Sequence, residues 1–503
     1  MVFPRILPYG QDAVYVDLGI ADAPDRAART HALAHVLRAR FPDADVIVGG
    51  GVLVTVGSPS VEDVTAALSI ASKAEQTNVL LEQTHVIGAA FDGPDLEDVS
   101  SSLGLSSDEV VDRLVANHFV VELVGFLPGF GYLGPLDPRL VLPRRKTPRP
   151  RVTAGSLGIA GAFAGIYPFS SPGGWHLLGR AVGISLFDPA RECPILLAPG
   201  DRVRFEALPA TDIPPVEATH PPALQIVAHN KPALVVEAAP ACATIQALGR
   251  GGQLHRGLPP SGPLDPDTFA AANLAVGNDP GEAAIEIPLG RLLVRAIGEV
   301  VVSIDGDKPI RLADGEQLEV KENARAVRYL GLRGGADVPV VLGSRATLLI
   351  ARTGGFSGRP LRKRDVVTIA DRTVREMQPP APVSTENTDI VDIAVDPGPH
   401  LDRFPPNALD TLLATTYSIS ALGDRVGVRI DGEKIPRAGG DSALPVPMVR
   451  GAIQVSTDGT PIVFGPDHPT TGGYPVLAVV RRSSWGALAR RRPGNAIRFV
   501  LGE

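Results

Sequence analysis

Arginines set among closely spaced glycines are the residues of this sequence best suited to chemistry. The densest group comprises the strings Gly125-Phe-Leu-Pro-Gly-Phe-Gly-Tyr-Leu-Gly134, Pro143-Arg-Arg-Lys-Thr-Pro-Arg149 and Ser171-Pro-Gly-Gly-Trp-His-Leu-Leu-Gly-Arg180. Glycines allow backbone N–H groups to converge on an anion, and arginine offers a planar fork to a carboxylate or a phosphate. Any one of these glycines is more often needed for a tight turn, but the group as a whole predicts an anionic ligand.

The second half of the chain holds a similar set of motifs, spread more widely. They are Leu248-Gly-Arg-Gly-Gly252, Pro260-Ser-Gly-Pro-Leu-Asp265, Ala272-Asn-Leu-Ala-Val-Gly-Asn278, Gly343-Ser-Arg345, Gly423-Asp-Arg-Val-Gly-Val-Arg429 and Asp467-His-Pro-Thr-Thr-Gly-Gly-Tyr474. Asp265 stands directly before a proline and an apolar stretch, so a helix N-cap is the more ordinary role for it. For Arg345 and Arg425, an ion pair within the fold fits the pattern as well as an anion site does.

The elements that must position these motifs change character near residue 120. Residues 24–40 and the segments after Ser60 and Ser106 predict helices, and residues 14–18 alternate as in a half-buried strand. Beyond residue 120, short strands between glycines and prolines predict barrels or sandwiches, with one helix after Asp265. The predicted division is an α+β subdomain (1–120), a β-barrel (121–208), a proline-rich linker (209–232), a β-rich subdomain (233–378), a second linker (379–389) and a second barrel (390–503).

An internal repeat connects the two barrel segments. The first copy contains Gly155-Ser-Leu-Gly-Ile159, Pro172-Gly-Gly-Trp175 and Pro199-Gly-Asp-Arg-Val-Arg-Phe205, and the second contains Gly451-Ala-Ile-Gln-Val455, Thr471-Gly-Gly-Tyr474 and Pro493-Gly-Asn-Ala-Ile-Arg-Phe499. The three elements keep their order and nearly equal spacing, although each tripeptide alone is a weak signal. The pattern predicts two copies of one β-rich module, one at the end of each half.

Composition sets limits on the function. The chain has 503 residues and a net charge of −7 with both signs interspersed, which argues against a nucleic-acid-binding surface. No apolar run approaches the ~20 residues that cross a bilayer, and the start shows no export signal, so we expect a cytoplasmic protein. The two cysteines are expected to be reduced and buried. His31 and His35 are expected to lie on a surface helix without metal, and no structural metal is predicted.

The longer motif strings resemble those of one family. Residues 5–206, from RILPYG through GFLPGFGYLG and SPGGWHLLGR to PGDRVRF, resemble its subunit 1, also labelled the B subunit of 5-oxoprolinase. Residues 240–500, from TIQALGR through PSGPLD and ANLAVGN to TTGGYP, resemble its subunit 2, also labelled the C subunit of that enzyme. The family carries the further labels of allophanate hydrolase subunits 1 and 2 and of the carboxyltransferase domain of urea carboxylase.

The resemblance implies a mainly β fold with an α+β part. It comprises two cyclophilin-like β-barrel modules, a small α+β domain before the first and a further β-rich domain at the start of the second half. Three residues depart from the family pattern: Val426 replaces a methionine, Ala346 replaces a serine and Pro469 interrupts the run before the threonines. None of these changes removes a charged group, although Pro469 could reshape the loop that carries Thr470.

The reactions attached to these family labels differ, and the residues favour one of them. The Gly-Gly-Ser-Ser setting of amidase-signature enzymes is absent, and no lysine adjoins Met377 or Met448 as in a biotin carrier. The resemblance therefore implies the B and C subunits of an ATP-dependent 5-oxoprolinase on one chain. This enzyme activates 5-oxoproline, by our hypothesis through phosphorylation, for ring opening to glutamate with a separate A subunit. No Walker A motif is present, so a nucleotide site would not be a P-loop.

The same resemblance assigns the site residues and partners. The catalytic candidates are Arg151, His176, Arg180, Arg345, Asp424 and Arg425, and the candidates for binding substrate or nucleotide are Gly173, Gly174, Trp175, Arg250, Asp265, Asn273, Thr470, Gly472, Gly473 and Tyr474. ATP with Mg²⁺ as counter-ion, no attached biotin, a partner that resembles the A subunit of 5-oxoprolinase, and a homo-oligomer are expected. Replacing Arg180 or Arg425 with alanine is expected to abolish turnover and leave the fold intact. The alternatives are a component of urea degradation and a non-catalytic regulator of a histidine kinase.

Overall fold

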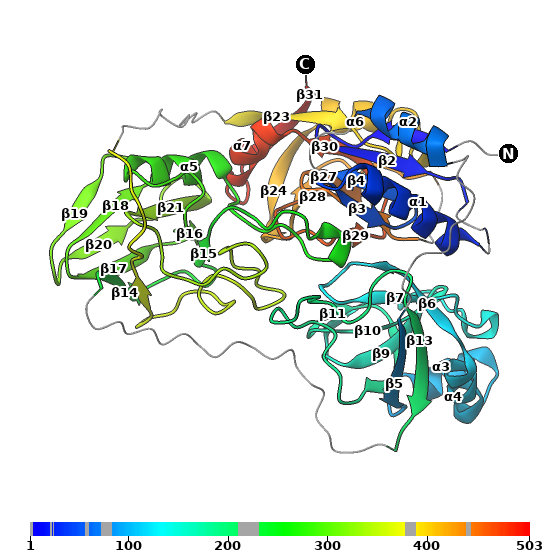
Figure 1. The fold of residues 1–503 in the computed structure, drawn as a ribbon. Coiled ribbons are helices and arrows are strands. Elements are labelled where there is room, and N and C mark those ends of the chain that lie inside the picture. The colour runs from blue at the N-terminus through cyan, green and yellow to red at the C-terminus, as the bar shows by residue number, and fades with distance from the viewer. Residues whose placement is uncertain are drawn as a thin grey trace.

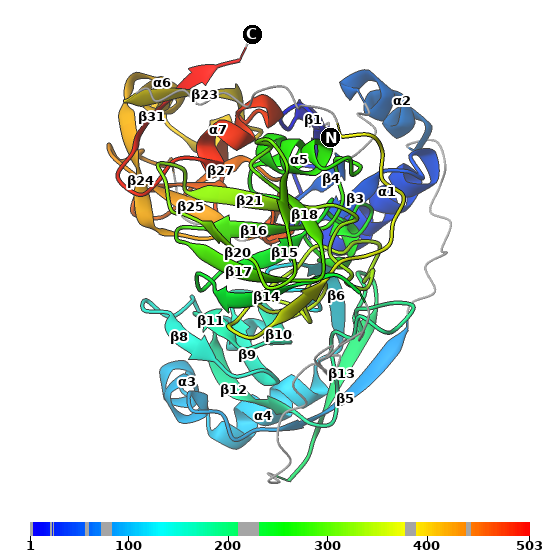
Figure 2. The same ribbon diagram turned by 90° about the vertical axis from the view of Figure 1, so that its left-hand side faces the viewer.

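Four β-rich parts follow one another along the chain (Figure 1). The computed structural model describes residues 4–20, 23, 25–55, 60–71, 83–209, 231–377, 389–438 and 444–502. Most of both predicted linkers, 209–232 and 379–389, lies outside the described residues. The first barrel lies in the lower part of both views, beneath the N-terminal sheet and the second barrel (Figures 1 and 2).

The N-terminal part is a four-stranded sheet in the order β1-β2-β4-β3. Its elements are β1 (Arg5–Pro8), β2 (Ala13–Asp17), α1 (Arg26–Arg40), β3 (Asp45–Val48), β4 (Val52–Thr55) and α2 (Val61–Ala71). The prediction that β2 is half-buried is wrong, because both faces of the strand are covered. Val14 and Val16 face a core shared with the first barrel, whereas Tyr15 packs in a cluster with Val446 and Val476 of the C-terminal part.

The first barrel is closed, in the order β10-β7-β6-β13-β5-β12-β9. Its strands are β5 (Thr84–Ala90), β6 (Phe119–Val124), β7 (Gly131–Gly134), β9 (Ser156–Ala160), β10 (Phe163–Ile166), β12 (His176–Ala181) and β13 (Arg202–Ala207). Beside it lie α3 (Leu96–Leu103), α4 (Ser107–Ala116), η1 (Pro138–Leu140) and the pair β8 (Arg149–Val152) and β11 (Ser171–Gly173).

The predicted boundary at residue 120 does not coincide with the start of this barrel. Strand β5 lies ahead of that boundary, yet it pairs in parallel with β13 at the far end of the module. A parallel pair needs a long connection. The connection from β5 to β13 contains α3, α4 and the other strands of the barrel. Local periodicity can identify helices such as α3 and α4, but it does not show that the strand before them belongs to the barrel that follows them.

The middle part consists of two sheets, β20-β17-β14-β22 and β15-β16-β21-β18-β19. The elements are β14 (Ala233–Ala238), β15 (Thr244–Gln246), η2 (Leu254–Arg256), α5 (Pro266–Ala275), β16 (Ala284–Pro288), β17 (Leu292–Ile297), β18 (Val300–Ile304), β19 (Ile310–Leu312), β20 (Gln317–Val320), β21 (Val327–Leu332) and β22 (Val366–Thr368). Apolar residues from both sheets share one core. The predicted helix after Asp265 is α5, with Pro266 as its first residue.

The second barrel is also closed, in the order β23-β30-β27-β28-β25-β24-β31. Its strands are β23 (Ile390–Pro397), β24 (Thr416–Gly423), β25 (Gly427–Asp431), β27 (Ala452–Val455), β28 (Pro461–Phe464), β30 (Val476–Val480) and β31 (Ala496–Leu501). The pair β26 (Val446–Pro447) and β29 (Thr471–Gly472), with η3 (Leu401–Arg403), α6 (Ala408–Ala414), η4 (Arg482–Ser484) and α7 (Trp485–Ala489), completes this part.

The predicted internal repeat is confirmed by the strand order. If β5 is matched to β23 and each later strand of the first barrel to its counterpart in the second, the two closed barrels have the same circular order. The small pairs β8–β11 and β26–β29 occupy equivalent places in the chain. The chain therefore holds two mainly β barrel modules of one topology.

Candidate functional site

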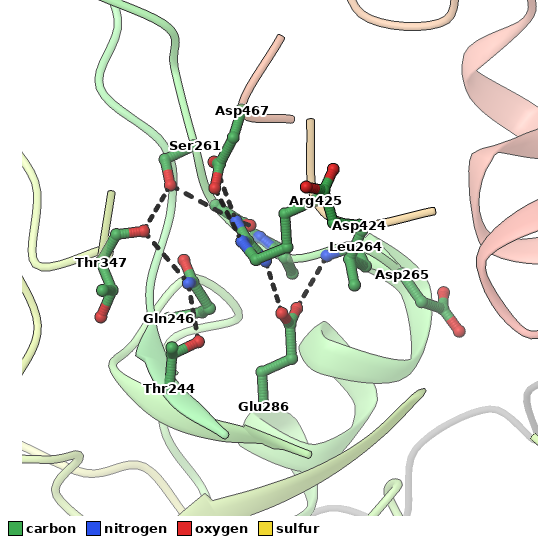
Figure 3. Close-up of polar contacts among 12 residues, drawn as sticks. Thr244, Gln246, Ser261, Leu264, Asp265, Glu286, Thr347, Asp424, Arg425 and Asp467 are labelled. Carbon is green, nitrogen blue, oxygen red and sulfur yellow. Dashed lines mark hydrogen bonds and ion pairs between the residues drawn. The ribbon is translucent and has the colours of Figure 1, made fainter. Parts of the chain in front are cut away.

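Arg425, in the turn between β24 and β25, is the centre of a buried polar cluster (Figure 3). Its side chain is only 7% exposed. Its Nε and Nη2 atoms donate to the Asp467 carboxylate at 2.9 and 3.1 Å, Nη1 donates to Glu286, and Nη2 also donates to the Gly262 carbonyl at 2.6 Å. Asp467 belongs to the second barrel and Glu286 to strand β16, so this guanidinium joins two parts of the fold.

Glu286 is fully buried and is held from several sides. It accepts hydrogen bonds from the Leu264 N–H at 2.8 Å and the Tyr329 hydroxyl at 2.7 Å. Burial alone would lower the pKa of Arg425, but Asp467 and Glu286 outweigh it and raise that pKa. The cluster is therefore a charged internal network, the structural alternative left open for Arg425 by the sequence. Its other candidate neighbour, Asp424, is exposed and accepts the Val426 N–H at 2.8 Å.

A second arginine of the C-terminal part, Arg450, forms hydrogen bonds to the loop Pro260–Asp265. Arg450 donates to the carbonyls of Pro263 at 3.1 Å and Leu264 at 2.6 Å, and its guanidinium lies 4.1 Å from the centre of the Trp485 ring. Sequence reasoning missed Arg450, Glu286 and Asp467 as network members. Asp467 begins one of the motifs singled out in the sequence, so it could have been proposed. Glu286 lies in an ordinary strand pattern that gives no such indication.

Asp265 and Asn273 are engaged in holding α5. Asp265 accepts the Thr268 N–H at 3.2 Å as an N-cap and pairs with Arg490 at 2.8 Å. The Asn273 amide donates to the Glu282 carbonyl at 2.8 Å. Both side chains are fully buried, so in this structure each has a structural role in holding α5.

The candidates from the first half lie on or beside the first barrel. His176 Nε2 is 3.0 Å from the Pro143 carbonyl, and Arg180 pairs with Asp92 at 3.1 Å. Arg151 is exposed on β8. Of the other candidates, Arg345 lies in the middle part, where it donates to the Val338 carbonyl at 3.1 Å. The candidate catalytic arginines are thus spread over three parts of the fold.

Glycine and threonine motifs of the two halves meet between the barrels. A Cβ added to Gly125, in the first barrel, would lie 2.1 Å from the Thr471 hydroxyl oxygen and 2.9 Å from that of Thr470. Both threonines are buried. A Cβ at Gly473 would lie 3.8 Å from Nη2 of Arg144, an arginine from the Pro143–Arg149 run. This junction, which we call the inter-barrel contact, brings candidates Thr470 and Gly473 against the first half.

The aromatic candidate Trp175 extends the inter-barrel contact into the first barrel. Its ring packs edge-on against Phe130 and Tyr132, with centroids 5.3 and 5.7 Å away. Tyr132 in turn interacts with Thr471, although burial dominates and raises the pKa of Tyr132. Gly173 lies against Tyr167, whose hydroxyl would be 2.5 Å from an added Cβ. In the second half, the guanidinium carbon of Arg437 lies over the Tyr474 ring, 5.5 Å from the ring centroid. Gly472 lies against the side chain of Gln454.

Two buried histidines are held neutral at the edges of the second barrel. Burial, reinforced by the charge of Arg403, lowers the pKa of His400 to about 4, while Asp402 opposes the shift. Burial also lowers the pKa of His468 to about 4, with Arg450 adding to the effect. The prediction for His31 is wrong in part, because this side chain is buried with Nε2 2.7 Å from the Glu122 carbonyl. The two cysteines are free, but exposed rather than buried.

We expect the free energy of unfolding to fall between pH 6.5 and pH 4. The unfolded chain takes up protons at its ordinary histidine pKa, whereas folded His400 and His468 resist protonation until about pH 4. The stabilisation that comes from keeping these two histidines neutral is thus fully present above pH 6.5. It is lost as the pH falls to 4, by on the order of 3 kcal/mol for each histidine. Urea unfolding from pH 7.5 to 4.5 measures the slope. His400→Gln should reduce it and replacement of the exposed His35 by Gln should not; equal slopes in all three proteins would contradict the assignment.

The comparisons with known proteins decide the family. The carboxyltransferase domain model for subdomains C and D matches residues 4–197, and the model for subdomains A and B matches residues 256–501. The C subunit of 5-oxoprolinase from Escherichia coli K12 is 32% identical over 51% of this chain and 87% of its own length. The chain belongs to the carboxyltransferase-domain family. The B subunit of 5-oxoprolinase from Escherichia coli O157:H7 is 51% identical over 24% of this chain and 55% of that protein.

Members of this family occur in several arrangements. A crystal structure of the protein TTHA0988 superposes with a TM-score of 0.82 at 30% identity and covers 99% of this chain and 100% of that one. The urea amidolyase of Lachancea kluyveri is 30% identical over 50% of this chain, which spans only 16% of that protein. The carboxyltransferase-type halves thus occur separately, fused to each other and within larger enzymes.

Within the described ranges, no three or more His, Cys, Asp or Glu side chains gather as a metal site would require. No described helix has the length and apolar character needed to cross a membrane.

Proposed function

We propose that this chain combines the B and C subunits of a 5-oxoprolinase and activates 5-oxoproline for ring opening. The observation that supports it most is that one chain holds a half similar to the B subunit, packed against a half similar to the C subunit. The inter-barrel contact places Gly125 against Thr470 and Thr471. Tyr9, in the connection between β1 and β2, also donates to the Pro447 carbonyl of the second half at 3.1 Å.

The chemistry demands activation because a lactam is a stable amide. In the proposed step the lactam oxygen attacks the γ-phosphorus of ATP and ADP leaves, with Mg²⁺ as the counter-ion of the nucleotide. The separate A subunit then completes hydrolysis to glutamate, and the complex works in the cytoplasm as a homo-oligomer of this chain. Phosphoryl transfer depends mainly on positioning and on neutralising charge. Arg180, with a partly exposed side chain paired to Asp92, fits the second task.

Phosphate release tests this proposal directly. The full chain is assayed with ATP and 5-oxoproline, urea or allophanate, with and without the A subunit. We expect release that depends on 5-oxoproline, and release with urea or allophanate instead would favour the urea-degradation alternative. Arg180→Ala should lower turnover by about 100-fold or more without changing the urea midpoint. The control is Arg498→Ala, which removes another partly exposed ion pair, with Asp392.

A further inference from the structure

Arg250 is a buried arginine whose hydrogen bonds are incompletely matched. Its exposed fraction is 1%, and Nη2 donates to the Ala346 carbonyl at 2.5 Å. Among the described residues, its Nε and Nη1 atoms have no hydrogen-bond acceptor. Two buried oxygens in the adjoining segments, Gln246 Oε1 and Thr353 Oγ1, also lack a partner within the described chain. Buried polar atoms are nearly always paired, so the unmatched Nε and Nη1 donors of Arg250 point to an acceptor on a ligand.

The charges near Arg250 are unbalanced in the positive direction. Burial, together with the charge of Arg425, lowers the pKa of Arg250 to about 10, so it remains a cation at neutral pH. The Asp467 carboxylate lies close enough to act on it but is already bonded to Arg425. Among the described residues, Glu286 and Asp467 are the carboxylates of the network that act on the three arginines Arg250, Arg425 and Arg450. An anion would supply the missing charge.

Residues close to Arg250 in the sequence are exposed. Its neighbour Leu248 is 65% exposed, and Gly251 and Gly252 are exposed with nothing within 4 Å of an added Cβ. On the inner side, Gly354 comes so close that its Cβ would lie 2.7 Å from Arg250 Nη2. The segment that carries Arg250 is therefore open to solvent on its outer side, while the guanidinium itself lies inward against Ala346 and Gly354.

We propose that Arg250 binds the carboxylate of the lactam substrate, with the Leu248–Gly252 segment closing over it. The identity of the ligand rests on the proposed function, in which 5-oxoproline is the substrate. A carboxylate fits because the site offers N–H donors and an unmatched positive charge, and arginine pairs with planar oxyanions. The lactam group would then be positioned relative to this fixed end of the molecule.

Binding of two lactams to the full chain tests the assignment. Isothermal titration compares 5-oxoproline with 2-pyrrolidinone, the same ring without the carboxylate, and with inorganic phosphate. Arg250→Met should weaken 5-oxoproline binding by about 10- to 100-fold, the effect of losing a charge-assisted hydrogen bond, and leave 2-pyrrolidinone binding unchanged. Because the variant removes an unmatched buried cation, its urea midpoint should be equal to or higher than that of the wild type. Arg311→Met, whose side chain is 66% exposed, is the control.

The outcomes separate this inference from the proposed function. If the wild type binds 5-oxoproline and Arg250→Met binds it equally well, the inference is overturned and the proposed function stands. A loss of stability in Arg250→Met with equal weakening for both lactams would show a purely structural arginine and also overturn it. If the wild type binds phosphate through Arg250 but not 5-oxoproline, the carboxylate assignment and the proposed function both fail.

Discussion

Replacing Arg425 with alanine is expected to lower the free energy of unfolding by about 3–5 kcal/mol, the cost of breaking a buried ion pair. The substitution leaves Glu286 and Asp467 buried without their shared cation, at 0% and 4% side-chain exposure. It also frees the Gly262 carbonyl in the loop between η2 and α5, which the second barrel holds through this arginine. The buried network argues against the sequence-based expectation that this variant keeps its fold intact, which stays a prediction. Urea unfolding followed by tryptophan fluorescence measures the loss.

Matched variants distinguish the cost of leaving buried carboxylates without their cation from the cost of removing any paired arginine. Arg498→Ala removes a pair with Asp392 in which both side chains are about half exposed, so its cost should be at most about 1 kcal/mol. Adding Glu286→Gln and Asp467→Asn to Arg425→Ala should recover part of the loss, because the buried negative charges are removed. Equal small losses for Arg425→Ala and Arg498→Ala would refute the structural role of the cluster.

The features that the sequence predicted correctly are those encoded by neighbouring residues. The helix predicted after Ser106 is α4, where Ser106 and Glu109 exchange hydrogen bonds as a capping box, and Asp265 caps α5, as its place before Pro266 indicated. The repeat was also visible, because each barrel module keeps its turn motifs in order. Such signals involve short separations, where local geometry decides the structure.

The features that escaped prediction depend on partners far apart in the chain. Arg425 and Glu286 are separated by 139 positions, so nothing near either residue indicates the pair. The same limit applies to Tyr15, whose packing partners belong to the second half. A polar–apolar alternation reports which side of a strand is more apolar, but not that another domain covers the second side.

The candidate glycines illustrate a further limit. Gly173 and Gly472 were selected for backbone groups that could face an anion, and the structure shows a packing reason for each. An added Cβ would meet the Tyr167 hydroxyl at 2.5 Å in one case and Gln454 Nε2 at 2.7 Å in the other. Composition cannot separate these two reasons, so ligand binding at these glycines stays a prediction. The arginines are easier to rank, because Arg425 is saturated by the protein whereas Arg250 is not.

The inter-barrel contact should be the second most sensitive point of the molecule. Gly125→Ala is expected to cost about 3 kcal/mol or more, the sum of overpacking and left-handed backbone strain. The added Cβ would lie 2.1 Å from the Thr471 hydroxyl oxygen, and the φ angle of Gly125 is +148°. Turnover with 5-oxoproline should fall together with stability, since the clash pushes apart the halves that the proposed site requires. Urea unfolding and phosphate release measure the two effects.

Two further variants separate the clash from the backbone strain. Gly161→Ala, in the same barrel, introduces a side chain at φ +57° where nothing lies within 4 Å, so only strain of about 1 kcal/mol is expected. Combining Gly125→Ala with Thr471→Ala removes the atom at 2.1 Å and should restore part of the lost stability, a coupling expected only of residues in contact. Strict additivity of the two substitutions would mean that these residues do not touch. The two halves would then depend on their other contacts, such as the hydrogen bond from Tyr9 to the Pro447 carbonyl and the approach of Gly473 to Arg144.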